Sequence, residues 1–179
     1  MTDFGGLLRR LVDAEVEFIL VGGVAATAHG SARLTSDIDI VYARTSGNIR
    51  NVVIALAGLH PYPRGAPPGL PFLWDEETVS RGLNFTLTTQ LGSIDLLGEI
   101  ASEDMLGSSG GGTYQNLLPH TVELIIHGFP HRCLDLDTLI QVKRAAGRFK
   151  DFEAIAELEA IREELVHDHT QRTNDSAIE

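Results

Sequence analysis

The chain has 179 residues, of which 43% are hydrophobic and 22% are charged, a composition typical of a globular protein with one domain. Its formal net charge of −11 argues against a protein that coats nucleic acid through a general basic surface. A single cysteine excludes an intrachain disulfide, and no apolar run reaches the ~18–20 residues of a membrane span, so we expect a cytoplasmic protein with no membrane partner.

Hydrophobic periodicity predicts helices and strands along most of the chain. Apolar residues three and four positions apart indicate amphipathic helices, whereas alternation and short apolar runs indicate strands. The predicted helices span 4–16, 22–30, 46–59, 136–147 and 150–166, and the predicted strands span 17–22, 36–43, 83–89, 92–98, 120–128 and 129–135. This order predicts an α/β (α+β) fold with a mixed β-sheet flanked by helices.

Three segments lack such periodicity. Residues 60–71 hold five of the seven prolines and predict a loop, and residues 98–116 predict an irregular segment with a Gly/Ser-rich centre. Residues 167–179 lack apolar spacing and predict a disordered tail. We therefore expect a core over 1–134, a helical pair over 135–166 packed on that core, and the tail over 167–179.

Two carboxylates interrupt the predicted strand 36–43. Asp37 and Asp39 are two residues apart, so on a strand they point to one face while Ile38 and Ile40 point into the core. Carboxylates this close repel each other, and Mg²⁺, which prefers hard oxygen ligands, removes that repulsion. The alternative is a solvated face on which two aspartates happen to alternate.

A glycine pair lies where the preceding strand ends and a helix begins. Gly22 and Gly23 would let a phosphate approach the backbone, and a helix N-terminus presents free N–H groups to it. The alternative is a tight turn between strand and helix. Because the glycine pair and the aspartate pair lie on adjacent elements, both can converge at one end of the sheet.

A third carboxylate, Asp95, lies between Ile94 and Leu96 in the second strand of the predicted hairpin. Three carboxylates on strands fit two-metal phosphoryl chemistry, in which the metals clamp the attacking and leaving oxygens. The alternative is an outward residue of a half-exposed strand, in which case Glu99 is the next candidate for the third carboxylate.

These motifs resemble the nucleotidyltransferase core of the DNA polymerase β superfamily, which has an apolar residue, Gly-Gly, a helix and then Asp-apolar-Asp-apolar. More narrowly, "GGVAATAHGSARLTSDIDI" followed by "LIQVKRAAGRFKDFEAIAEL" is similar to the AbiEii-type nucleotidyltransferases, which are toxins of toxin–antitoxin and phage-abortive systems. The resemblance covers about residues 5–162, and it identifies the expected core over 1–134 as a nucleotidyltransferase core.

The resemblance implies that a nucleoside monophosphate is transferred from a nucleoside triphosphate to an acceptor hydroxyl on RNA (tRNA) or protein. It implies two Mg²⁺ ions, with Mn²⁺ as a substitute, and a cognate antitoxin as the partner of a toxin. By position, Asp37 and Asp39 would ligate both metals, and Asp95 would ligate the catalytic metal and help deprotonate the acceptor. The implied nucleotide-binding residues are Gly22, Gly23, Arg33, Ser36, Lys143 and Lys150.

The chain departs from the family in two places. Many superfamily members have Gly-Ser where this chain has Gly22–Gly23, and the larger toxins have a longer C-terminal helical region. Asp151, beside Lys150, is equally compatible with capping the last helix. Two other functions stay open: a catalytically reduced binding or antitoxin module, and a small-molecule transferase of the aminoglycoside type, whose cationic substrate would suit an acidic surface.

Overall fold

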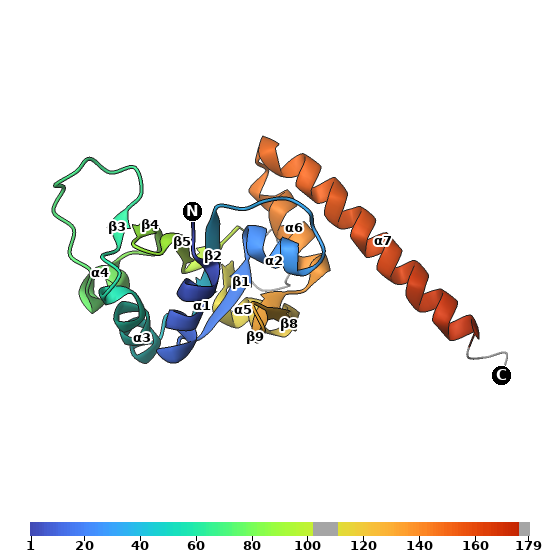
Figure 1. Cartoon of the computed structure of the whole chain (residues 1–179), viewed down its shortest axis with the longest axis horizontal. Helices are drawn as coiled ribbons and strands as arrows, with labels where there is room; N and C mark the ends of the chain where they lie inside the picture. Colours follow the sequence, from blue (N-terminus) through green and yellow to red (C-terminus); the bar gives the residue numbers. More distant parts are fainter. Residues whose placement is uncertain (102–110, 176–179) are drawn as a thin grey trace.

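The computed structural model describes residues 1–101 and 111–175, with only the backbone described for residues 150 and 168–175. Its centre is a seven-stranded sheet in the order β3-β4-β5-β2-β1-β9-β8 (Figure 1). Strands β6 and β7 form a second, two-stranded sheet. The strands are β1 (Phe18–Val21), β2 (Asp37–Tyr42), β3 (Tyr62–Pro63), β4 (Asn84–Thr89), β5 (Gly92–Leu97), β6 (Glu99–Ile100), β7 (Gly112–Thr113), β8 (Thr121–Ile126) and β9 (Phe129–Leu134).

The large sheet is mixed, which confirms the predicted fold class. Strand β1 is antiparallel to β2 and parallel to β9, β2 is parallel to β5, and the hairpins β4–β5 and β8–β9 are antiparallel. The register places Asp39 opposite Val21 on one side and opposite Asp95 on the other. Thr86 on β4 is in turn opposite Asp95, so one row of residues crosses the middle of the sheet.

Several of the helices begin or end at residues that satisfy free backbone groups. They are α1 (Phe4–Asp13), α2 (Gly22–Ala28), α3 (Ser46–Ala57), α4 (Glu76–Arg81), α5 (Tyr114–Leu117), α6 (Leu136–Ala146) and α7 (Phe152–Asp175), with 3₁₀ turns η2 (Leu118–His120) and η3 (Phe149–Asp151). The side chains of Asp3, Thr45, Asp75 and Asp135 accept a backbone N–H at the starts of α1, α3, α4 and α6. Gly147 ends α6 in the left-handed conformation.

The core lies between the sheet and its helices. On the two central strands Ile38, Ile40, Ile94 and Leu96 are fully buried, whereas the aspartates that alternate with them are only partly buried. Helix α2 packs against β1 and β2, and α6 packs against both α2 and α7. The alternation thus turns the three aspartates toward the side of the sheet on which α2 begins.

Helix α7 continues to Asp175, past the predicted end at residue 166, so the predicted tail is helical up to that point. Its first turns are anchored on the core through Ile155 and Leu158, and Figure 1 shows the rest of the helix projecting away from the sheet. Once the first turns are fixed by packing, each further residue adds one helical hydrogen bond, which accounts for the extension. Residues 176–179 of the predicted tail lie outside the described residues, and the division into core and helical pair stays a prediction.

Two predicted irregular segments contain short elements. Strand β3 lies inside the proline-rich segment 60–71, and the ends of the segment 98–116 form β6, β7 and the start of α5. Residues 102–110 of that segment lie outside the described residues. Among the described helices, including the long α7, none combines the length and the apolar composition that crossing a membrane requires.

Candidate active site

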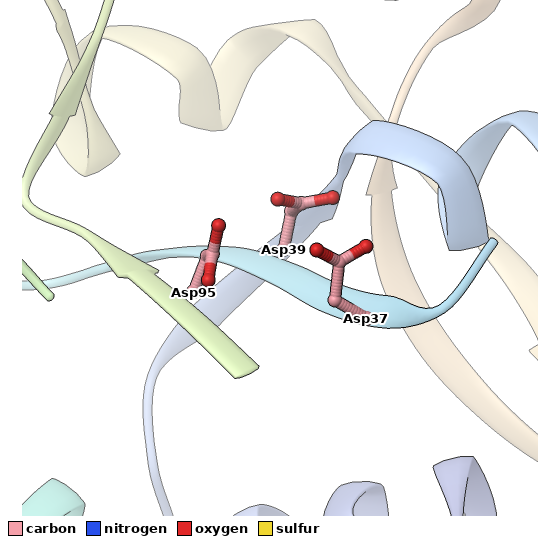
Figure 2. A group of neighbouring side chains, drawn as sticks. All are labelled: Asp37, Asp39 and Asp95. Carbon is pink, nitrogen blue, oxygen red and sulfur yellow. The ribbon is translucent and has the colours of Figure 1, made fainter. Parts of the chain in front are cut away.

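The structure brings the three predicted catalytic aspartates together. Asp37 and Asp39 come from β2 and Asp95 comes from the neighbouring strand β5, and Figure 2 shows the three carboxylates on one side of these strands. One carboxylate oxygen from each lies within 4.8 Å of the others. The parallel pairing of β2 with β5 produces this cluster, because it sets Asp39 directly opposite Asp95.

Asp39 lies in an environment that disfavours its negative charge. Burial, followed by the charges of Asp37 and Asp95, raises the pKa of Asp39 from 3.8 to about 6. A hydrogen bond from the Gly23 backbone and the charge of Arg148 act in the opposite direction without cancelling the rise. The cluster therefore favours either a proton or a bound cation over three free negative charges.

Side chains larger than that of glycine do not fit at residues 22 and 23, and at residue 22 the obstacle is Asp39. Gly22 has a φ of +64°, and a Cβ atom there would lie 2.0 Å from Asp39 Oδ2. A Cβ atom on Gly23 would lie 2.5 Å from the Thr35 side chain. The β1–α2 turn thus packs directly on the carboxylate cluster. The two interpretations of these glycines, as a tight turn and as part of the site, are therefore compatible.

A cavity of about 650 Å³ lies over this turn and the carboxylates. Its lining includes seven of the predicted site residues: Gly22, Gly23, Arg33, Asp37, Asp39, Asp95 and Lys143. Glu99, the fallback carboxylate, also lines it. Ser36 is exposed and is not among the described lining residues, and its carbonyl accepts a hydrogen bond from the Thr2 hydroxyl. The side chain of Lys150 lies outside the part of the chain that is described.

The wall formed by α6 and the start of α7 carries positive charge. Lys143 Nζ lies 3.5 Å from Asp151 Oδ1, and Arg148 Nε lies 2.6 Å from Asp151 Oδ2. Lys143 and Asp151 are both buried, whereas the Arg148 side chain is 56% exposed. Asp151 therefore holds two cations at the cavity wall. Arg33, between α2 and β2, pairs with Glu153 at the start of α7 at 3.0 Å.

Sequence reasoning missed Arg64. It follows β3, and its guanidinium contacts both Asp37, with Nη1 3.0 Å from Oδ2, and Asp95. Nothing in the local pattern distinguishes Arg64 from other polar residues of a proline-rich loop. Its relation to the aspartates becomes visible only when β3 pairs with β4, which places Arg64 one strand away from β5.

Comparisons with known proteins agree with this geometry at the level of the fold. No protein-family model and no curated protein matches the chain. Among solved structures, a proposed nucleotidyltransferase from Thermotoga maritima superimposes with a TM-score of 0.54 at 16% identity, covering 87% of this chain and 93% of that one. The antibiotic-resistance factor ANT(2'')-Ia superimposes with a TM-score of 0.52 at 14% identity, covering 100% of both chains. The chain has a nucleotidyltransferase fold. At these identities the likeness concerns the fold alone, and the activity has to be argued from the site.

Proposed function

We propose that this protein is a metal-dependent nucleotidyltransferase that transfers a nucleoside monophosphate from a nucleoside triphosphate to an acceptor hydroxyl. The observation that carries the proposal is the cluster of Asp37, Asp39 and Asp95, whose oxygens lie within 4.8 Å of one another in a cavity with a cationic wall. The carboxylates suit a divalent cation, and the cationic wall suits a polyphosphate next to it.

The three carboxylates fit a divalent cation on two grounds. All three ligands are hard oxygen donors, which Mg²⁺ and Mn²⁺ prefer. The pKa of Asp39, raised to about 6 by burial and by the neighbouring carboxylates, also indicates that a negative charge here is disfavoured unless a cation compensates it. The resemblance to the DNA polymerase β superfamily supports two Mg²⁺ ions, which when bound would neutralise the phosphates and activate the acceptor oxygen.

Other residues of the chain have roles that follow from their positions. Lys143, on α6, and Arg148, just before η3, line the cavity, where their charges attract the phosphates of a nucleoside triphosphate. Asp151 positions both cations and compensates the burial of Lys143. In this proposal Asp95 also accepts the proton of the acceptor hydroxyl, and the backbone of Gly22 and Gly23 approaches the phosphates. Arg33, Ser36 and Lys150 remain proposed nucleotide contacts.

Two classes of acceptor are compatible with this site. The narrower resemblance to AbiEii-type toxins supports RNA (tRNA) or protein as the acceptor, with a cognate antitoxin as partner. A cationic small molecule is the second candidate, because the net charge of −11 attracts cations and because one structural neighbour is an antibiotic-resistance factor. The complete set of three carboxylates argues against a binding module without catalytic activity.

The test is transfer of label from each α-labelled nucleoside triphosphate, in the presence of Mg²⁺, to cellular RNA, cellular protein or a set of aminoglycosides. We expect one acceptor class to be labelled and the rate to fall at least about 100-fold in Asp39→Asn and Asp95→Asn, because each removes a charged metal ligand. Asp13→Asn, which removes an exposed carboxylate on α1, is the matched control and retains activity. A wild-type protein that binds no nucleoside triphosphate with Mg²⁺ in calorimetry would contradict the proposal.

A further inference from the structure

Arg64 bridges two members of the carboxylate cluster, Asp37 and Asp95. Its Nη1 donates to Asp37 Oδ2 at 3.0 Å, and its Nη2 donates to Asp95 Oδ1. The three side chains are only 30%, 26% and 18% exposed. A guanidinium this well shielded, with one nitrogen on each carboxylate, forms stronger hydrogen bonds than an exposed ion pair.

The backbone of Arg64 is fixed by the sheet, although its side chain has four rotatable bonds. The Arg64 N–H donates to the Thr86 carbonyl at 2.9 Å, which continues the β3–β4 pairing by one residue. Thr86 lies opposite Asp95, so Arg64 belongs to the same row of the sheet as the site. Its guanidinium can therefore leave the carboxylates by side-chain rotation while the strand stays in place.

A divalent cation and the Arg64 guanidinium compete for the same carboxylates. A metal held by the cluster would be coordinated by oxygens of Asp37 and Asp95, and it would also repel a positive charge beside it. We propose that Arg64 is the resident counter-cation of this site: it neutralises Asp37 and Asp95 in the metal-free protein and releases them when a divalent cation binds. This inference rests on the proposed function, because it requires a metal on these carboxylates.

Competition from Arg64 would lower the metal affinity of the site. Any group that stabilises the metal-free state lowers the apparent metal affinity by the same factor. Arg64 also keeps two partly buried carboxylates compensated when no metal is present. The protein would then load its metal only when the cation concentration is high enough to displace the arginine.

The experiment measures Mn²⁺ binding by electron paramagnetic resonance of free Mn²⁺, together with thermal unfolding, and requires no turnover. Arg64→Gln keeps a polar side chain without charge, and Arg50→Gln is the matched control, since Arg50 pairs with Glu76 on the surface at 3.2 Å. We expect Arg64→Gln to bind Mn²⁺ roughly tenfold tighter than wild type, and Arg50→Gln to bind as wild type does. In EDTA, Arg64→Gln should unfold at a lower temperature than wild type, and saturating Mn²⁺ should remove that difference.

The outcomes separate the two proposals. If wild type and Arg64→Gln bind Mn²⁺ with the same affinity, or the variant binds more weakly, the role of Arg64 is wrong while the metal site stands. If neither binds Mn²⁺, the proposed function fails and this inference fails with it. Should Arg64→Gln not fold, Arg64→Met decides, because it also removes the positive charge while keeping a flexible unbranched side chain. An unchanged Mn²⁺ affinity in that variant would overturn the inference.

Discussion

At the scale of single residues, Asp39 makes the folded protein sensitive to pH. A carboxyl group whose pKa rises on folding stabilises the folded state at low pH, where it is protonated, and this contribution is lost as the pH rises through the folded pKa. For Asp39 the loss extends from about pH 4 to above about pH 6, following the shift from 3.8 to about 6. Replacing this aspartate with a neutral isostere should therefore stabilise the folded protein most at high pH.

We expect Asp39→Asn to stabilise the metal-free protein at pH 8 by about 1–3 kcal/mol, with the lower value applying if solvent screens part of the shift. At pH 5 only about half of that stabilisation should remain, because Asp39 is then protonated in folded wild type but already ionised in the unfolded chain, and the effect vanishes only below about pH 4. Urea unfolding in EDTA at the two pH values measures the difference. Asp13→Asn, at an exposed position of α1, serves as the control, and an Asp39→Asn gain that is equal at both pH values would contradict the expectation.

Gly22 is the second residue whose identity the site dictates. Alanine there combines a left-handed φ of +64° with a Cβ atom 2.0 Å from Asp39 Oδ2, so either the turn or the carboxylate has to move. We expect Gly22→Ala to lower the free energy of unfolding by at least about 1–3 kcal/mol and to weaken Mn²⁺ binding.

The matched control for Gly22→Ala is Gly47→Ala in α3. A Cβ atom at Gly47 has no neighbour within 4 Å, so the substitution should be neutral or stabilise the helix by about 0.5–1 kcal/mol. Urea unfolding and Mn²⁺ titration of both variants provide the comparison. Equal behaviour of the two variants would show that the contact between the turn and Asp39 is not needed.

At the scale of elements, the central strands were predictable because their signal is local. Ile38 and Ile40 alternate with the two aspartates, and the same alternation around Asp95 predicts β5, so the period of two identifies both strands and the face of the cluster. The metal-ligand candidates could therefore be found from sequence. Their mutual distance could not, since it depends on the parallel register of β2 and β5.

Elements that depend on distant partners were not predictable. Strand β3 contains Pro63 and only two residues, and it exists because Tyr62 and Pro63 pair with β4. Helix α4 has six residues. The guanidinium of Arg44 donates hydrogen bonds to the carbonyl oxygens of Ser80 and Gly82 at the C-terminal end of this helix. No local pattern reports such contacts, and for the same reason Arg64 was not recognised as part of the site.

The contact between α6 and η3 supports a prediction about stability. Asp151 compensates the buried Lys143, so Asp151→Ala leaves an ammonium without its counter-charge and should cost on the order of 3–5 kcal/mol. The double variant Lys143→Met, Asp151→Leu should be more stable than Asp151→Ala, because no buried charge remains. Urea unfolding measures both variants.

The control for this pair is the exposed ion pair of Arg50 with Glu76, whose side chains are 66% and 50% exposed. Replacing either residue with alanine should change the free energy of unfolding by less than about 1 kcal/mol. If Asp151→Ala is no more damaging than Glu76→Ala, then Asp151 does not compensate Lys143 in solution.

At the scale of the whole molecule, the net charge of −11 acts on any acceptor that approaches the cavity. Such long-range forces are screened as salt is added, with a Debye length of ~30 Å at 0.01 M and ~10 Å at 0.1 M. An anionic acceptor is repelled by the protein as a whole, whereas a cationic acceptor is attracted. The salt dependence of transfer therefore distinguishes the two acceptor classes.

We expect kcat/KM for an RNA acceptor to rise between about 0.01 M and 0.1 M salt, and kcat/KM for a cationic aminoglycoside to fall over the same range. The double variant Glu163→Lys, Glu164→Lys, at exposed positions of α7, makes the net charge less negative and should flatten both slopes. Pyrophosphate release at saturating nucleoside triphosphate measures the rates. If RNA transfer instead falls steeply with salt, local phosphate contacts on the wall of Lys143 and Arg148 outweigh the overall charge, and RNA becomes the stronger acceptor candidate.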